Sequence, residues 1–569
     1  KMEKMAAGSL FTAARGKDRL SEASLDDETC LERGQFMSGA CSGFIHEVGK
    51  LQSFHAELAE GPLLLHRPVV GEIGVSVETS PVEAHLETPS TGVGQVAMRA
   101  APRNDGQERI AITGMSILNA LGKSPEEIWA GSLAMKSGIT LVPSSRWDHN
   151  AFYDPRPLVP DKTYCKVGAF LDFNVSRNEL GIPPQDFRTM TPATKNTMWL
   201  AEKAIRASGI LESDIPPERI GVIISQNSGE AAGTLTNIII RAYVHDILSA
   251  VKRAVTLTTD QESAIVREVK SGRMAPDDTT LLGRINCAAA GFICNRYGFM
   301  GPSYAVSAAC STSLVALYSA IQMIRNNIID AAIVGGGEED LTHLHFLEFA
   351  AVGALFGLSG RERPPHETSR PFDGERDGMV LGEGGGMIVI ERESLARARG
   401  ARIHSVITGM GASNNNMGMV ESNSVTQEIA IRASFRGIPY GPDAVDLVEC
   451  HATSTRQGDV EEVRALKSFF SPSRRTVLTS FKSQIGHTLG ASGISNIIRG
   501  TMAMQAGVFP GTLNYAHPDP EMGLEGSGLL IPPEPSDWKT VDGEPRRLQV
   551  NAFGFGGSNY VVQMEEAMG

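Results

Sequence analysis

The sequence predicts an α/β fold organised around a largely parallel sheet. Short apolar segments alternate with stretches whose apolar residues recur at helical spacing, and this alternation is typical of adjacent strands covered by helices on both faces. Glycine is abundant, with 60 residues among 569, which suits the tight turns of such a fold. An apolar content of 41% is enough for a large buried core.

The predicted strands fall into two series along the chain. The first series lies at residues 110–113, 220–224, 304–306 and 331–334. The second series lies at residues 387–390, 403–408, 445–448, 476–480, 548–553 and 560–564. Two glycine runs, at residues 335–337 and 382–386, lack the spacing of a nucleotide-binding loop, so we interpret both as tight turns.

Cys310 is the first candidate catalytic residue. It stands between the predicted strand at residues 304–306 and a segment with helical spacing that begins at Leu314. A thiol in the first turn of a helix faces the positive end of the helix dipole, so we expect its thiolate form to be favoured. Cys310 is therefore a candidate nucleophile, although a cysteine at such a turn can also be a small packing residue.

Two histidines follow strands of the second series. His451 comes after the apolar run at residues 445–448, and His487 follows the strand at residues 476–480, five residues after Lys482. Both therefore lie near strand C-terminal ends, where α/β sheets place their ligand crevices. Near the C-terminus, the glycine-rich segment at residues 551–559 can bring backbone N–H groups close to a reacting oxygen.

Together these segments resemble the β-ketoacyl-acyl-carrier-protein synthases, condensing enzymes of the thiolase-like fold. The resemblance runs from about Arg109 to about Met564, with the motifs of Cys310, His451 and His487 in the family's order. Several separated motifs in one order are more specific than a single short pattern. The resemblance implies two related halves in five α-β-α-β-α layers, which we expect at residues 109–380 and 381–569, usually in a homodimer.

The resemblance also implies the chemistry of the site. An acyl group passes from a carrier thioester to Cys310, and a malonyl thioester then loses carbon dioxide and attacks the acyl-enzyme. His451 and His487 would hold the charge that develops on the malonyl thioester oxygen, while Lys482 would orient them and balance charge. Backbone N–H groups of Cys310 and Phe555 would receive the acyl oxyanion, and Phe555 would gate the malonyl half-reaction.

Substrate-binding residues carry over in the same way. Thr453 and Thr455 match family positions that hydrogen-bond the pantetheine arm, and we assign Phe553 to substrate binding with them. We expect no cofactor and no metal bound directly, because the acyl carrier protein brings its own phosphopantetheine arm. Arg188 and Arg361 fall where related enzymes present basic residues near the pantetheine entrance. They are interpreted either as carrier-docking residues or as solvated surface arginines.

Two positions depart from the family pattern. Ala452 stands where the family usually has glycine, and Asn496 stands where it often has a glutamate that pairs with the active-site lysine. Without that carboxylate, Lys482 needs another partner, and Glu462 is the nearest family-matched candidate. The departure at Asn496 bears on the decarboxylation step and leaves the nucleophile unaffected.

Two segments lie outside or beyond the usual pattern. Residues 1–108 are expected to form an N-terminal extension, with an amphipathic helix at about residues 37–59 followed by a linker. This extension suits either contact with other synthase domains or subunits, or a disordered leader. The polar, helix-prone stretch at residues 243–284 either caps the substrate tunnel, extends the dimer surface, or is a surface insertion without function.

Composition excludes several classes of protein. A formal net charge of −13 disfavours a nucleic-acid binder, and no apolar run is long enough to span a bilayer. Seven cysteines without a CxxC pair indicate a reducing compartment, so we expect a soluble, cytoplasmic protein.

The sequence therefore predicts a ketosynthase that performs decarboxylative Claisen condensation in polyketide or fatty-acid biosynthesis. One alternative is an acyltransferase that loads Cys310 and passes the acyl group on without condensation, which the Asn496 departure leaves open. The other is a chain-length or scaffold partner, although such partners typically lack the reactive cysteine.

Overall fold

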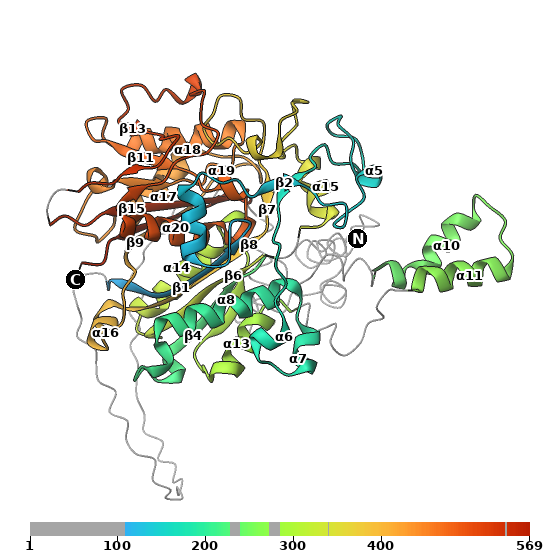
Figure 1. Cartoon of the computed structure of the whole chain (residues 1–569), viewed down its shortest axis with the longest axis horizontal. Coiled ribbons are helices and arrows are strands. Elements are labelled where there is room, and N and C mark those ends of the chain that lie inside the picture. The colour runs from blue at the N-terminus through green and yellow to red at the C-terminus, as the bar shows by residue number, and fades with distance from the viewer. Residues whose placement is uncertain (1–107, 228–238, 272–284, 339–340, 541–542, 569) are drawn as a thin grey trace, which may run out of the picture. The chain divides into compact units, whose positions relative to one another are not determined.

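The computed structural model describes residues 108–227, 239–271, 285–338, 341–540 and 543–568 (Figure 1). These residues form a mixed sheet of eleven strands with helices on both faces. In spatial order the strands are β13 (Leu529–Leu530), β11 (Thr476–Thr479), β10 (Leu447–Glu449), β15 (Arg547–Gly554), β16 (Ser558–Glu565), β9 (Ser405–Asn414), β1 (Ile110–Asn119), β8 (Gly384–Arg392), β6 (Ala331–Gly337), β4 (Ile220–Ser225) and β5 (Ser303–Val306).

The middle of the sheet is antiparallel, which corrects the prediction of a largely parallel sheet. Strands β5, β4 and β6 are parallel at one end, and β15, β10, β11 and β13 are parallel at the other. Between these ends, β6, β8, β1, β9, β16 and β15 pair antiparallel. Part of the reason is local, because the short Gly556–Gly557 turn joins β15 and β16 as a hairpin, which forces antiparallel pairing.

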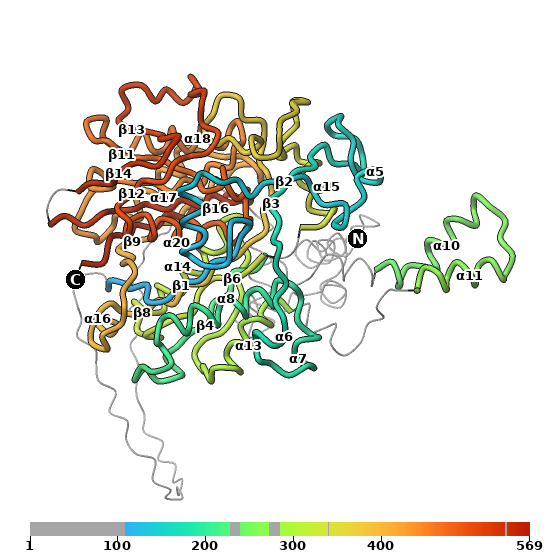
Figure 2. The backbone as a smooth tube through the Cα atoms, viewed as in Figure 1, coloured from blue at the N-terminus to red at the C-terminus, as the bar shows by residue number. Residues whose placement is uncertain are grey.

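The two halves of the sheet meet where β1 pairs with β9, as Figure 2 shows. The shared register is short, with Ile110 opposite Ile407 and Ile112 opposite Ser405. Each predicted strand is present in the structure, and several run longer than predicted. Apolar runs were sufficient to find the strands because the sheet is buried on both faces.

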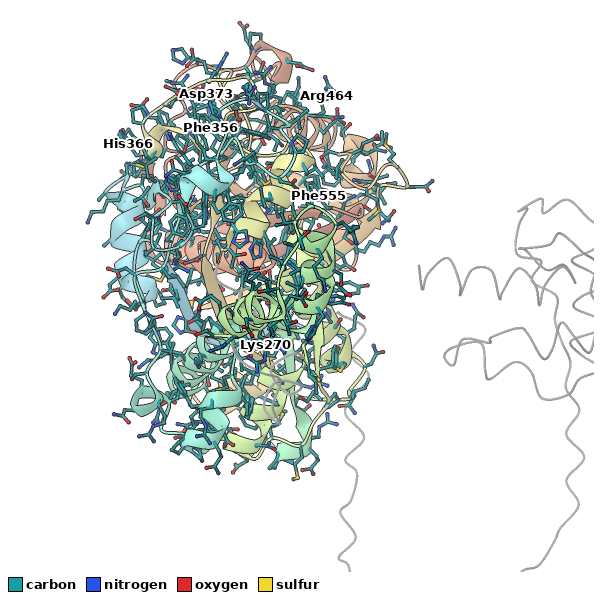
Figure 3. The ribbon with its side chains drawn as sticks, turned by 90° about the vertical axis from the view of Figure 1, so that its right-hand side faces the viewer. Lys270, Phe356, His366, Asp373, Arg464 and Phe555 are labelled. Carbon is teal, nitrogen blue, oxygen red and sulfur yellow. The ribbon has the colours of Figure 1, made fainter. Side chains whose placement is uncertain are left out.

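Helices form three layers around the two halves of the sheet. α14 (Thr312–Arg325) and α20 (Ser492–Ala506) pack on each other and on strands of both halves, so they form the central layer. α8 (Pro192–Ser208) and α13 (Ala288–Tyr297) cover the outer face of the first half. α17 (Ser424–Ser434) and α18 (Arg456–Phe469) cover the outer face of the second half. The result is the predicted five-layer α-β-α-β-α arrangement, with side chains filling the space between layers (Figure 3).

The central layer is the most deeply buried part of the fold. On α14, Leu314, Leu317, Ile321 and Ile324 are fully buried at helical spacing, as the sequence predicts. α20 is buried over nearly its whole length, with Ile494 in the same apolar cluster. Cys310 lies in the turn that leads into α14, so this buried layer fixes the position of the candidate nucleophile.

The glycine runs are strand segments, and the prediction of tight turns is wrong. Gly335 lies in β6 opposite Met387, and Gly336 lies opposite Gly386 of β8. A Cβ at Gly335 would lie 2.2 Å from the Gly386 carbonyl oxygen, and the φ of Gly335 is +131°. The two backbones approach too closely for side chains, so glycine is required here by contact rather than by a turn.

Shorter elements connect this framework. The remaining helices are α4 (Pro125–Leu133), α5 (His149–Phe152), α6 (Arg177–Leu180), α7 (Pro184–Thr189), α10 (Val244–Lys252), α11 (Thr259–Lys270), α15 (His343–Ala351), α16 (Glu393–Ala398) and α19 (Lys482–Ile485). The remaining strands are β2 (Ile139–Leu141), β3 (Val167–Ala169), β7 (Leu381–Gly382), β12 (Val508–Phe509) and β14 (Ser536–Asp537). In the described part of the chain, no helix combines the length and apolar character needed to cross a bilayer.

Two predicted segments lie partly or wholly outside the described residues. The predicted amphipathic helix at residues 37–59 and its linker fall outside them. Of the 243–284 stretch, the structure describes α10 and α11, which contact each other and share an ion pair between Lys252 Nζ and Glu262 Oε1 at 2.7 Å.

Candidate active site

Cys310 lies at the junction between β5 and α14. It belongs to a single 3-10 turn, Ala309–Ser311, that leads directly into α14, and its side chain is buried. Ala309 has a φ of +48°, a left-handed conformation that is unfavourable for alanine. Backbone strain next to a reactive side chain is common at functional sites, where the surrounding structure enforces it. This turn points the thiol away from α14 and into a pocket.

Burial controls the charge state of the thiol. Desolvation raises the pKa of Cys310 to about 11, against the opposing effects of the Lys482 charge and the backbone N–H of Phe555. The expected stabilisation of the thiolate at the helix start is therefore outweighed by desolvation. At pH 7 a thiol with this pKa is almost entirely protonated. Acyl transfer to Cys310 therefore needs a group that accepts the thiol proton.

The two predicted histidines meet Cys310 in space. His451 follows β10, and His487 lies between α19 and a 3-10 turn at Leu489–Ala491. Their ring centroids are 5.5 Å apart at an interplanar angle of 82°. One side-chain atom each from Cys310, His451 and His487 lies within 4.8 Å of the other two. Residues that are distant in the sequence thus share one small volume because the 3-10 turns that lead into α14 and α20, Ala309–Ser311 and Leu489–Ala491, contact each other.

Both imidazoles are neutral near pH 7. Burial, followed by the positive charge of Lys482, holds the pKa values of His451 and His487 well below their usual range. Among the described residues, Nδ1 of His451 and both ring nitrogens of His487 have no hydrogen-bond partner. A neutral imidazole can donate one N–H and accept at the other nitrogen. These two rings can therefore donate to an oxyanion or accept a proton inside the pocket.

Lys482 is buried beside the histidines, as predicted. Its Nζ has no hydrogen-bond partner in the part of the chain that the structure describes, and burial lowers its pKa. Glu462 exerts the largest opposing charge on Lys482. Its carboxylate accepts N–H groups of His451 at 2.8 Å and Ala452 at 2.7 Å, and the Asn551 side-chain amide at 2.8 Å. Glu462 therefore compensates the lysine through charge while its oxygens hold the backbone of His451.

The two departures from the family pattern take structural roles. Asn496 does not pair with Lys482, because its Nδ2 donates to the Cys450 carbonyl oxygen at 3.3 Å. The N–H of Ala452 is engaged by Glu462, and its side chain is buried. Neither substitution removes a group from the Cys310 and histidine cluster.

Phe555 lies next to the nucleophile. The backbone N–H groups of Phe555 and of Cys310 itself both act on the Cys310 sulfur and lower its pKa. An oxyanion formed on a carbonyl attached to this sulfur would lie near the same two donors. The Phe555 ring stacks on Phe349 with centroids 6.2 Å apart, and Phe553 lies 6.0 Å from the His451 ring.

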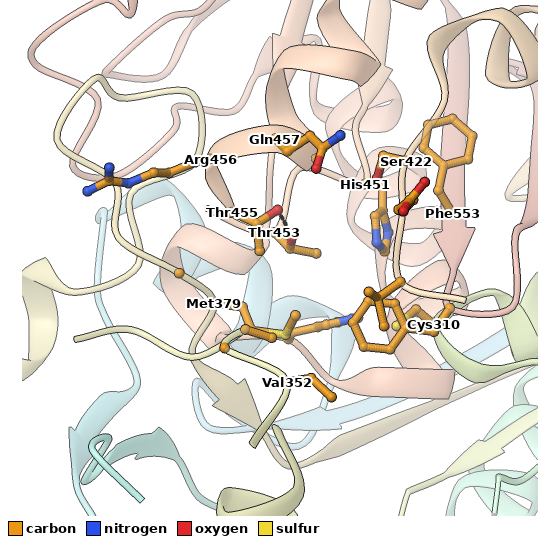
Figure 4. A pocket seen from close by; sticks show the side chains of 18 of the residues that line it. Cys310, Val352, Met379, Ser422, His451, Thr453, Thr455, Arg456, Gln457 and Phe553 are labelled. Atoms are coloured by element: carbon orange, nitrogen blue, oxygen red, sulfur yellow. Dashed lines mark hydrogen bonds between the residues drawn. The ribbon is translucent and has the colours of Figure 1, made fainter. Parts of the chain in front are cut away.

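A pocket of about 290 Å³ connects these groups (Figure 4). Its lining includes Cys310, both histidines, Phe553 and Phe555. Thr453 and Thr455 also line it, with their hydroxyl oxygens 3.1 Å apart. The pocket can therefore admit a narrow chain that carries both apolar and amide groups.

The arrangement does not favour a metal ion. Zinc bound by one cysteine and two histidines would lie beside the Lys482 ammonium, whose charge opposes a dication. A second group, Asp373, Glu375 and His517, also has ligand atoms within 4.8 Å of one another. There the Asp373 carboxylate already accepts Arg370 Nε and the backbone N–H groups of residues 375, 516 and 517.

The two predicted docking arginines lie on different elements. Arg188 is exposed at the end of α7 and does not line the pocket. Arg361 is exposed and donates to the Glu375 carbonyl oxygen at 2.8 Å, three residues after Leu358, which does line the pocket. The structure does not bring the two arginines into one cluster with the pocket, and their role in docking stays a prediction.

Comparison of the sequence with models of protein families identifies the family to which this chain belongs. The beta-ketoacyl synthase N-terminal domain matches residues 107–396, and the C-terminal domain matches residues 404–516. The chain belongs to the β-ketoacyl synthase family. The ketosynthase is 32% identical over 474 residues to polyketide synthase GfsB of Streptomyces halstedii, covering 81% of this chain and 8% of that protein. It is 30% identical over 501 residues to the spectinabilin polyketide synthase system protein NorC of Streptomyces orinoci, covering 85% of this chain and 20% of that one.

A solved structure agrees with the family assignment. The ketosynthase from module 6 of the bacillaene synthase from Bacillus subtilis 168 matches with a TM-score of 0.66 at 26% identity, covering 81% of this chain and 72% of that chain. The protein is thus a condensing enzyme of the acyltransferase class with a thiolase-like fold. Its matched region spans 8% of the length of GfsB and 20% of the length of NorC.

Sequence reasoning missed a buried ion pair behind the site. Arg499 on α20 and Glu449 on β10 are both fully buried, with Nη1 and Oε1 3.0 Å apart. Arg499 also donates to the Gly511 carbonyl oxygen at 3.0 Å. An arginine within an apolar helix was the available signal, since a charge in that position requires a buried partner.

Proposed function

We propose that this ketosynthase joins an acyl group held on Cys310 to a malonyl unit with loss of carbon dioxide, in polyketide assembly. The observation that carries the proposal is the convergence of the Cys310 thiol and two neutral imidazoles within 4.8 Å. The relatives named above are polyketide synthases, which supports that pathway over fatty-acid synthesis.

The first half-reaction is thioester exchange. The Cys310 sulfur attacks the acyl carbonyl, the new C–S bond forms, and the carrier thiol leaves with a proton. Because burial raises the pKa of Cys310 to about 11, a neutral imidazole accepts the thiol proton as attack occurs. The N–H groups of Cys310 and Phe555 stabilise the tetrahedral oxyanion.

The second half-reaction is decarboxylation and carbon–carbon bond formation. As the malonyl carboxylate leaves as carbon dioxide, negative charge moves onto the thioester oxygen. N–H donors from His451 and His487 stabilise that enolate in a cavity where little water competes. The enolate carbon then attacks the Cys310 thioester and the bond between the acyl carbon and the sulfur breaks. The cysteine sulfur leaves as a thiolate, which takes up a proton from solvent. Burial, together with the Lys482 charge, holds the pKa values of both histidines low and keeps their rings neutral.

An acyl carrier protein supplies both substrates through its phosphopantetheine arm. Thr453, Thr455 and Phe553 line the pocket in which this arm would lie. Arg188 and Arg361 are the proposed docking residues on the outer surface. Other synthase domains or subunits are proposed partners of the segment at residues 1–108, since the relatives are far longer than this chain.

A homodimer is proposed for the assembled enzyme. β5 is an edge strand of the eleven-stranded sheet and only partly covered, so its free edge can pair with that of a second copy. Along α10 and the residues on either side of it, apolar side chains are exposed at four-residue spacing, which gives a stripe suited to helix packing. The stripe consists of Tyr243, Ile247, Val251 and Val255.

Domain division and cellular location complete the proposal. We propose that residues 109–380 and 381–569 form the two catalytic halves. A cytoplasmic location is supported by the cysteines, because Cys165, Cys287, Cys294, Cys310 and Cys450 are all free thiols.

Intact-protein mass spectrometry and carbon dioxide release test the proposal together. The enzyme is incubated with an acyl-carrier thioester, and the adduct is located; it should appear on Cys310 and be absent from Cys310→Ala. Malonyl-carrier is then added, and carbon dioxide and a β-ketoacyl-carrier product should form. An adduct without carbon dioxide release would indicate the non-elongating acyltransferase, and no adduct would indicate the scaffold partner.

A further inference from the structure

Arg456 occupies the end of the pocket that lies farthest from the nucleophile. It is the first residue of α18, directly after the loop that carries His451, Thr453 and Thr455. All four residues line the pocket, and Figure 4 shows Arg456 and Cys310 at opposite ends of it. A chain that enters at Arg456 therefore passes the two threonines before it reaches the thiol.

Charges in the pocket lining are few. The described residues that line the pocket include one arginine or lysine, which is Arg456, and two acidic residues, which are Asp377 and Glu421. Arg456 Nη2 donates to Asp377 Oδ1 at 3.2 Å, and its side chain is 64% exposed. A guanidinium has five N–H donors, so this one contact leaves donors for a ligand. Asp377 also accepts the N–H and hydroxyl of Ser359, which share its negative charge.

The backbone around Arg456 is held in place. Arg376, which is buried, donates through Nε to the Thr455 carbonyl oxygen at 3.0 Å and through Nη2 to that of Arg456 at 2.5 Å. Ser454 just before has a φ of +70°, which sharpens the loop. Gln457 and Gly458, the next residues of α18, also line the pocket, so the positive end of this helix adds to the arginine charge.

The chemistry of the carrier arm matches this order of groups. A phosphopantetheine arm has its thioester at one end, amides along its length and a phosphodiester at the other end. With the thioester at Cys310 and the amides near Thr453 and Thr455, the phosphate reaches the pocket mouth. We propose that Arg456 binds the phosphate of the phosphopantetheine arm, an inference that rests on the proposed function. Arginine suits this task because its planar guanidinium can bind two phosphate oxygens at once.

Two acyl donors that differ only in the phosphate test the inference. Hexanoyl-phosphopantetheine and hexanoyl-pantetheine are compared as donors to Cys310, and kcat/KM for acylation is measured by intact-protein mass spectrometry. The wild-type enzyme should prefer the phosphorylated donor by about tenfold, as a charge-assisted contact implies. Arg456→Ala should lose this preference, so that the ratio of the two kcat/KM values falls to about one.

Matched variants separate charge from structure. Arg456→Lys should keep part of the preference, because it retains the charge without the planar pair of donors. Arg464→Ala removes another exposed arginine of α18, labelled in Figure 3, that does not line the pocket and should keep the full preference. A full preference in Arg456→Ala, or none in the wild type, would overturn the inference alone. Failure of both donors to acylate Cys310 would instead overturn the proposed function, and the inference with it.

Discussion

Replacing His487 with alanine should slow decarboxylation far more than acylation of Cys310. Both ring nitrogens of His487 lack partners among the described residues, and the side chain is 1% exposed. In a buried site a donor aimed at developing charge is worth about 2.7–4 kcal/mol, so its loss should lower the rate by about 10²–10³-fold. His487→Asn keeps a side-chain N–H donor and should retain part of the activity.

The pH dependence gives an independent check on the same residue. Burial and the Lys482 charge hold the pKa of His487 well below its usual range, so the ring stays neutral as pH falls from 8 to 6. Carbon dioxide release should therefore show no loss near pH 6.5 from histidine protonation. A lowered pKa means that protonation, and any loss it causes, appears only at more acidic pH.

The assay is single-turnover release of carbon dioxide from malonyl-carrier by enzyme already acylated on Cys310. Acyl loading measured by mass spectrometry serves as the control for folding and for the first half-reaction. Release by His487→Ala within about threefold of the wild-type rate would refute the assignment. A decline with a midpoint near pH 6.5 in the wild type would refute the neutral state of the histidines.

Three further predictions concern stability and the thiol. Arg499→Met leaves Glu449 buried and unpaired, so the free energy of unfolding should fall by about 3–5 kcal/mol in chemical denaturation. Adding Glu449→Gln to that variant should recover most of the loss, and no recovery would argue against the pair. Since burial raises the pKa of Cys310 to about 11, its alkylation by iodoacetamide should accelerate about tenfold per pH unit from pH 7 to 9; a plateau near pH 8 would contradict this. Gly335→Ala should lower the melting temperature much more than Gly298→Ala. Both glycines have a positive φ, but only at Gly335 would a Cβ lie 2.2 Å from a backbone atom. Equal shifts in melting temperature would show that the backbone conformation alone, and not the close contact, sets the cost.

Much of the fold was predictable because its signals are local. The strand containing residues 304–306 and the helix from Leu314 were visible as apolar patterns, and both occur at β5 and α14. The direction of strand pairing was not predictable, because the apolar pattern of a buried strand does not distinguish a parallel from an antiparallel neighbour. The glycines at 335–337 and 384–386 were wrongly predicted to form turns. Glycine is required there because the backbone of a strand from a distant part of the chain lies too close for a side chain.

The candidate site shows the same division. Cys310, His451, His487 and Lys482 were identified from residue types and motif order, and their identities required no coordinates. Their charge states were not predictable, because the pKa of Cys310 depends on how completely the fold removes water from it.

The amino-acid sequence was thus sufficient to predict which elements form and which side chains carry the chemistry, since backbone propensity and side-chain chemistry are properties of single residues and short segments. The fold was needed to show that the thiol is protonated and that the imidazoles are neutral. Burial and electrostatic coupling depend on groups that are distant in the chain, and folding alone brings them together.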